Sequence, residues 1–132
     1  RIYLRNFLSH WSHRQDWIDP ELETWVDNFM KPGNLQGGFN WYRSIHEARL
    51  ATIEGRSTPP PPIATPTHVL WGEHDPVLKV SWTDRLPEFF SDLQLEVAAA
   101  AGHFVHLEAP DLAVESIAAF FDGLARRPQS GA

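Results

Sequence analysis

The sequence predicts an α/β fold in which parallel strands with crossover helices follow a helical segment. After the proline-rich stretch at 56–66, β-rich runs alternate with helical patterns in the order strand, helix, strand, helix, which favours parallel pairing. Before that stretch, apolar residues recur at helical spacing, and four of the six tryptophans are found there. We therefore divide the chain into a helical segment, a connection, an α/β segment and a tail, at residues 1–55, 56–66, 67–126 and 127–132.

The composition argues against several classes of function. A net charge of -6 without any cluster of lysine and arginine argues against a nucleic-acid partner. No apolar run approaches the ~20 residues of a membrane span, so we expect no membrane partner. The chain has no cysteine, which excludes disulfides, thiolate metal sites and a cysteine nucleophile, and which fits a cytoplasmic location.

The helical segment contains two stretches with recognisable boundaries. In 18–33, Asp19 is the predicted N-cap, Pro20 suits the first helical position, and a Lys-Pro-Gly sequence ends the helix. In 35–55, a Gly-Gly pair marks a loose start, and the apolar spacing predicts either a second helix or a broken pair of helices.

The α/β segment begins with a short strand at 67–71, bounded by a proline and a glycine. A helical pattern follows at 81–93, and Pro87 is expected to shorten or kink that helix. The alternating run at 93–98 predicts the second strand, and 110–124 predicts the clearest helix of the chain. This last helix carries one apolar stripe, which consists of Val114, Ile117, Phe121 and Leu124.

The loops that follow the two predicted strands each carry a residue capable of acid–base chemistry. Asp75 follows the first strand and His103 the second. Because the carboxyl ends of parallel strands meet at one edge of a sheet, we expect the two side chains to lie side by side. A carboxylate beside an imidazole fixes its tautomer and stabilises the imidazolium that forms on protonation. Gly102 is expected to let the backbone turn sharply and aim His103.

These residues also have structural interpretations. A histidine after a glycine can be a solvated loop residue, and Glu108 can pair with a backbone N–H near the start of the next helix. His103 with His106, or His10 with His13, could be considered as metal ligands, but no third ligand follows at a known metal spacing. We therefore expect no metal.

Two stretches, TPTHVLWGEHDPV and AAGHFVHLEAPDLAVESIAAFF, resemble the C-terminal end of an α/β-hydrolase. In that fold an acid follows a late strand, and a histidine lies in a G-H-[FW]-x-x-x-E-x-P-like loop before the last helix. The resemblance implies that Asp75 is the acid and His103 the general base. Their separation suits one strand–helix–strand passage between them.

The stretch PGNLQGGFNWYRS resembles the helical cap of the epoxide hydrolase and haloacetate dehalogenase branch of that fold. The resemblance implies that 1–55 is a cap segment and that Tyr42 donates a hydrogen bond to the epoxide oxygen. A phenol can donate to the alkoxide that develops as the ring opens. We expect Trp41, Phe39 and Trp11 to line an apolar substrate pocket.

The G-x-[SD]-x-G elbow that would carry the nucleophile of such an enzyme does not occur in the chain. We therefore expect the chain to be the C-terminal part of a longer protein, and the isolated segment to be inactive and unstable. The expected partner is an N-terminal hydrolase core segment, in the same or another chain, together with a small-molecule substrate.

The favoured function is that of an epoxide-hydrolase-like enzyme that forms a covalent ester on an aspartate, which His-activated water then hydrolyses. This hydrolysis needs no cofactor. A haloacetate dehalogenase would use the same two steps, with Trp41 and Tyr42 holding the departing halide. A serine nucleophile would instead make the protein a serine hydrolase of the same fold. A non-catalytic remnant is the alternative outside enzymes, and the missing elbow is the observation in its favour.

Overall fold

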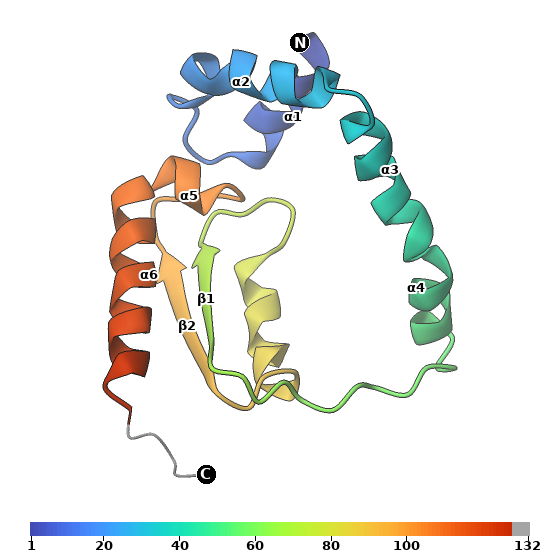
Figure 1. The fold of residues 1–132 in the computed structure, drawn as a ribbon, viewed down its shortest axis with the longest axis vertical. Coiled ribbons are helices and arrows are strands. Elements are labelled where there is room, and N and C mark those ends of the chain that lie inside the picture. The colour runs from blue at the N-terminus through green and yellow to red at the C-terminus, as the bar shows by residue number, and fades with distance from the viewer. Residues whose placement is uncertain (128–132) are drawn as a thin grey trace.

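The computed structural model describes residues 1–127 as helices surrounding a small sheet (Figure 1). The first half is helical and the second half alternates strands with helices. In chain order the elements are α1 (Ile2–Trp11), α2 (Ile18–Met30), α3 (Asn34–Ser44), α4 (His46–Ile53), β1 (Thr67–Gly72), the 3-10 helix η1 (Val80–Glu88), β2 (Leu93–Ala98), α5 (Val105–Glu108) and α6 (Pro110–Ala125). Of the predicted tail at 127–132, all but the first residue lies outside the described residues.

The two strands pair in parallel along their whole length, from Thr67 opposite Leu93 to Gly72 opposite Ala98. This confirms the parallel arrangement predicted from the alternation of strands and helices. Both strands point toward α5 and toward the α1–α2 pair, while α6 and η1 lie on opposite sides of them (Figure 1). The loops that leave β1 and β2 therefore share one edge of the sheet, below α1 and α2.

The segment around Pro87 forms a 3-10 helix that ends at Glu88, earlier than the predicted end at 93. Proline lacks the N–H that an α-helix needs at that position, which agrees with the shortening expected from the sequence. Beyond the helix, Phe90 forms an isolated parallel bridge with Ile63 of the proline-rich connection. The chain is thus already extended before β2 begins.

The main core joins α1 and α2 to the loop after β2. It is composed of Leu4, Leu8, Trp17, Ile18, Leu22 and Phe104. The prediction that Asp19 caps α2 and that Pro20 is its first residue is wrong, because the helix begins at the buried Ile18, two residues before Pro20. The Asp19 carboxylate instead accepts hydrogen bonds from the Arg5 guanidinium of α1, at 2.8 and 3.1 Å.

The stretch predicted as a second helix or a broken pair is a broken pair, divided at Ile45 between α3 and α4. The turn before α3 is made by Gly33, which has the left-handed φ of 84° that glycine tolerates. Gly37 and Gly38 lie inside α3 instead of marking a loose start. Figure 1 shows α3 and α4 one after the other on the side of the molecule away from α6, and neither helix has a buried residue.

Helix α6 matches the predicted helix, but its apolar stripe does not face this sheet. Val114, Ile117 and Phe121 are all more than half exposed, whereas the small residues Ala113 and Ser116 are buried against the strands. Small side chains allow a helix to approach a sheet closely, which explains why that face is turned inward. No helix within residues 1–127 combines the length and the apolar character needed to cross a membrane.

Candidate active site

The side chains of Asp75 and His103 form a hydrogen-bonded pair at the shared edge of the sheet. Asp75 lies three residues after β1 and His103 five residues after β2. The imidazole Nδ1 is 2.9 Å from the Asp75 Oδ2. The Asp75 side chain is 6% exposed and that of His103 is 22% exposed, so the acid is enclosed while the ring remains open to a reactant. The juxtaposition predicted from the two loops is present.

The second oxygen of Asp75 holds the carboxylate in place. Oδ1 accepts the backbone N–H groups of Val77 and Leu78, at 2.8 and 2.9 Å, within the turn that follows β1. Because an ionised carboxylate only accepts hydrogen bonds, the Nδ1 of His103 carries the proton that it shares with Oδ2. In the neutral form of such a ring the lone pair is on Nε2, which is the arrangement that a general base requires.

Two glycines let the loops come this close. A Cβ atom on Gly72 would lie 2.0 Å from the carbonyl oxygen of Gly102 and 2.7 Å from that of Ala101. A Cβ atom on Gly102 would lie 2.6 Å from the backbone nitrogen of His13, in the loop between α1 and α2. The chain turns at Ala99–Ala100 and bends at His103, but Gly102 does not have a positive φ, so the turn does not depend on a left-handed glycine. Glycine is required there because another backbone segment passes directly over it.

Two aromatic side chains contact the His103 ring. Trp11 meets it edge-on with ring centroids 4.8 Å apart, and Phe104 does so at 5.2 Å. The backbone N–H of His103 also donates to the carbonyl oxygen of Trp11, at 3.1 Å. The end of α1 therefore borders the imidazole, and the structure brings Trp11 to the candidate pair.

The other predicted pocket residues gather in an apolar hollow of about 550 Å³ between α1, α2 and α3. Phe39, Trp41 and Tyr42 of α3 line it, together with Trp11 and other side chains of α1. The Tyr42 side chain belongs to this hollow, whereas Asp75 and His103 border a smaller one with β1. Trp11 connects the two, because it lines the apolar hollow and contacts the His103 ring.

Sequence reasoning missed a contact between the acid loop and the loop of residues 12–16. The rings of His13 and His74 stack at a centroid distance of 4.1 Å. The backbone N–H of His74 donates to the carbonyl oxygen of Ala101, which ties the acid loop to the histidine loop as well. No spacing pattern links these residues, so only the folded arrangement reveals that three loops meet here. Within residues 1–127, no group of three metal-binding side chains comes together.

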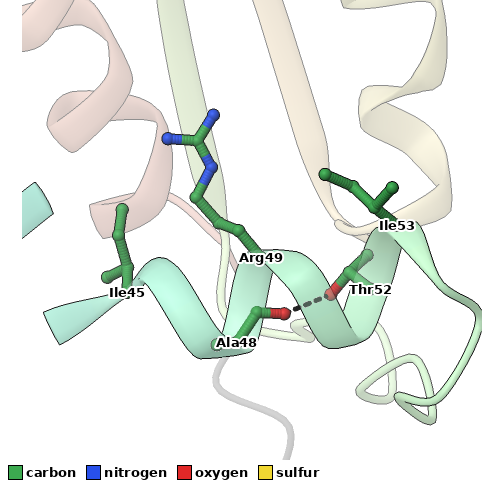
Figure 2. Close-up of a pocket in the computed structure, with 5 residues that line it drawn as sticks. All are labelled: Ile45, Ala48, Arg49, Thr52 and Ile53. Carbon is green, nitrogen blue, oxygen red and sulfur yellow. Dashed lines mark hydrogen bonds between the residues drawn. The ribbon is translucent and has the colours of Figure 1, made fainter. Parts of the chain in front are cut away.

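A further shallow hollow lies on α4 and is formed by one helix alone (Figure 2). Ile45, Arg49 and Ile53 project from the same side of the helix, as their four-residue spacing requires. The Thr52 hydroxyl donates to the carbonyl oxygen of Ala48 at 2.9 Å, so this polar group is used within the helix. The hollow offers an apolar surface and no acid–base pair.

No family model matches the chain. Among curated proteins, it is 32% identical over 115 residues to epoxide hydrolase A of Mycobacterium tuberculosis, which covers 84% of this chain and 34% of that protein. It is 29% identical over 119 residues to epoxide hydrolase 3 of Mus musculus, covering 86% of this chain and 30% of the relative. A third similarity, 44% identity over 48 residues, is to the monoacylglycerol lipase ABHD6 of Mus musculus and covers 36% of this chain and 14% of the lipase. The chain spans about a third of the length of the epoxide hydrolases that it matches.

Proposed function

We propose that this chain, whose homologues support a hydrolase of the α/β-hydrolase family, is the part of an epoxide-hydrolase-like enzyme that carries the acid and the general base. The observation that carries the proposal is the hydrogen bond between Asp75 and His103 at the carboxyl ends of two parallel strands. In this proposal 1–55 is a cap segment, 56–66 the connection and 67–126 the C-terminal core segment.

The reaction would proceed in two steps. An aspartate outside this chain attacks an epoxide carbon, the carbon–oxygen bond breaks, and an ester forms while the ring oxygen takes a proton from the Tyr42 phenol. Nε2 of His103 then removes a proton from water, and the resulting hydroxide attacks the ester carbonyl. Asp75 stabilises the imidazolium in this second step, and collapse of the tetrahedral intermediate releases the diol and the aspartate. The imidazolium then loses its proton to solvent, and the Tyr42 phenolate takes one back from solvent.

Tyr42 is the proposed donor to the epoxide oxygen in the first step. Tyr42 lines an apolar hollow, and a phenol there can donate a hydrogen bond to the alkoxide that develops on the epoxide oxygen. Phe39, Trp41 and Trp11 would supply the apolar contacts that hold the substrate.

We infer that an N-terminal hydrolase core segment, in the same or another chain, completes the enzyme. Each of the two strands has one partner among the described residues, so the sheet has open edges. The outer stripe of α6 and the Ile45–Ile53 side of α4 both leave apolar side chains in solvent. Surfaces of this kind are normally covered by another segment of protein.

A serine hydrolase is the second candidate, because the similarity to a monoacylglycerol lipase has the higher identity although it is short. The same acid and base would then serve a serine, and the substrate would be an ester. The nucleophile distinguishes the two reactions, whereas the residues of this chain serve both.

The test uses the full-length protein with styrene oxide, chloroacetate and fluoroacetate, and a p-nitrophenyl ester as three separate substrates. We expect diol formation from styrene oxide, and we expect His103→Gln to trap an ester that intact-mass measurement detects as one added substrate mass. Halide release alone would assign a dehalogenase, and ester cleavage alone would assign a serine hydrolase. If none of the substrates is turned over and no adduct forms on His103→Gln, the proposed function is wrong. Diol formation unaffected by Tyr42→Phe would remove Tyr42 from the mechanism.

A further inference from the structure

Glu108 is a carboxylate buried to 1% exposure, and it binds four backbone N–H groups. Its Oε2 accepts from His13 and Arg14 at 2.8 Å and from Gly102 at 2.9 Å. Its Oε1 accepts from Phe104 at 3.1 Å. The first two groups belong to the loop between α1 and α2, and the other two flank His103 in the loop between β2 and α5. One side chain therefore joins two loops that are about ninety residues apart in the chain.

A buried carboxyl group is tolerated when it is hydrogen-bonded, and Glu108 accepts from four N–H donors, three on Oε2 and one on Oε1. The Arg14 guanidinium donates to the backbone carbonyl oxygen of Glu108 at 2.9 Å and forms its ion pair with Asp16. Removing the carboxylate would leave these four buried or half-buried donors without partners. The substitution should therefore disturb both loops.

The backbone around the imidazole is held from both sides. The N–H groups before and after His103 both go to Glu108, and that of His103 itself goes to the carbonyl oxygen of Trp11. Three consecutive amides are thus fixed, two of them by one carboxylate. The Nδ1–Oδ2 distance of 2.9 Å to Asp75 depends on where this backbone lies.

We propose that Glu108 is a positioning residue that sets the place of the His103 imidazole by clamping the histidine loop to residues 13–14 of the α1–α2 loop. That His103 acts as a general base rests on the proposed function. Because the same carboxylate holds both loops, a displacement of the α1–α2 loop is transmitted to the base. The clamp therefore couples the helical segment to the general base.

In the proposed two-step reaction, a substitution of Glu108 should affect only the second step. Formation of the ester does not use His103, whereas hydrolysis of the ester does. A variant that misplaces the ring by about 1 Å should slow hydrolysis by roughly 100-fold and leave ester formation unchanged, so that the ester accumulates. The substitution of a residue that only stabilises the fold would lower the amount of active enzyme. It would not change the fraction of that enzyme held as the ester.

The experiment compares full-length wild type, Glu108→Gln and the control Glu21→Gln, which alters an exposed glutamate of α2. The amide of the glutamine has nearly the shape of the carboxylate, but its NH2 group faces at least one N–H donor and cannot accept from it. Rapid quenching of a styrene oxide reaction, followed by intact-mass measurement, gives the fraction of enzyme held as ester. We expect that fraction to rise in Glu108→Gln alone.

A second readout does not need a substrate. In NMR spectra of the full-length protein, the hydrogen-bonded Nδ1 proton of His103 should be lost or shifted in Glu108→Gln and unchanged in Glu21→Gln. A folded Glu108→Gln protein with the wild-type signal and the wild-type ester partition would overturn the proposal. If wild type turns over no epoxide, the proposed function fails, and the NMR comparison still decides whether Glu108 positions the ring.

Should Glu108→Gln fail to fold, hydrogen exchange of the wild-type protein decides the question. The amides of Arg14 and Gly102 should then be protected to a similar degree and open together, because one carboxylate oxygen binds both. Rapid exchange at Arg14 with full protection at Gly102 would show that the two loops are not clamped, and it would overturn the proposal.

Discussion

Gly72→Ala is the substitution that most directly tests how the candidate pair is assembled. The added Cβ would lie 2.0 Å from the carbonyl oxygen of Gly102, and the atoms in the way belong to backbone and not to a flexible side chain. To reach an ordinary contact of 3.4 Å, the end of β1 and the histidine loop must separate by about 1.4 Å. That movement takes His103 away from Asp75 and stretches their 2.9 Å hydrogen bond beyond hydrogen-bonding range.

The structure sets the expected size of both effects. Forcing a methyl group into a tightly packed site typically costs about 1–3 kcal/mol, and rigid backbone neighbours place this site at the upper end of the range. Misplacing the proposed general base by about 1 Å should lower kcat roughly 100-fold. The change in kcat thus exceeds what partial unfolding of a protein destabilised by this amount would cause at room temperature.

The assay measures the melting temperature and the kcat of the full-length protein with the substrate that wild type turns over. Gly123→Ala is the matched control, because nothing lies within 4 Å of its added Cβ and it occupies a position within α6. Alanine favours a helix over glycine by about 1 kcal/mol, so this control should be as stable as wild type or slightly more stable. Wild-type melting and turnover in Gly72→Ala would show that the close approach of the two loops is not needed for the site.

Three further outcomes are expected of the full-length protein. Asp75→Asn should lower kcat by about 10⁴-fold with little change in melting temperature, because the ring loses its orienting acceptor, and steady-state kinetics measure this. Ile117→Asp should lower the melting temperature by several degrees, because we infer that another segment covers the apolar stripe of α6. Ala119→Asp, on the opposite side of α6, should not lower it. Equal melting temperatures of the two variants would contradict this inference. The hydrogen bond from Arg5 lowers the pKa of Asp19 in the folded protein. The ion pair therefore stabilises the fold at pH values above the ordinary pKa of an aspartate, and this stabilisation is lost as the pH falls through the lowered pKa. Asp19→Asn should therefore melt below wild type at neutral pH and low salt, and the difference, measured by calorimetry, should vanish on acidification.

The strands and the candidate pair could be predicted because their signals are local in the chain. A short β-rich run bounded by proline and glycine identifies β1, and parallel pairing alone brings the loops with Asp75 and His103 to one edge. The resemblance to a known fold added the expected roles of these residues. Neither inference needed to know how the helical segment lies on the sheet.

The remaining features depend on contacts that no sequence pattern reports. Glu108 binds backbone groups of residues 94 and 95 positions away, and any residue except proline would provide those N–H groups. Hydrophobic periodicity predicts that α6 has an apolar stripe, but it does not say which of two apolar faces meets this sheet. Ser116 and Ala113 are turned inward because they are small, and Ile117 is left outside.

The two halves of the chain meet at the candidate site mainly through backbone groups. Gly102 passes under the backbone nitrogen of His13, the N–H of His103 donates to the carbonyl oxygen of Trp11, and Glu108 binds the N–H groups of residues 13 and 14. Backbone contacts depend little on side-chain identity, so the loop at 12–14 can vary in sequence and still hold the imidazole. The positions that cannot vary are Gly102, which must lack a Cβ, and Glu108, whose two oxygens must reach both loops. This explains why a glycine precedes the histidine although its φ is not positive.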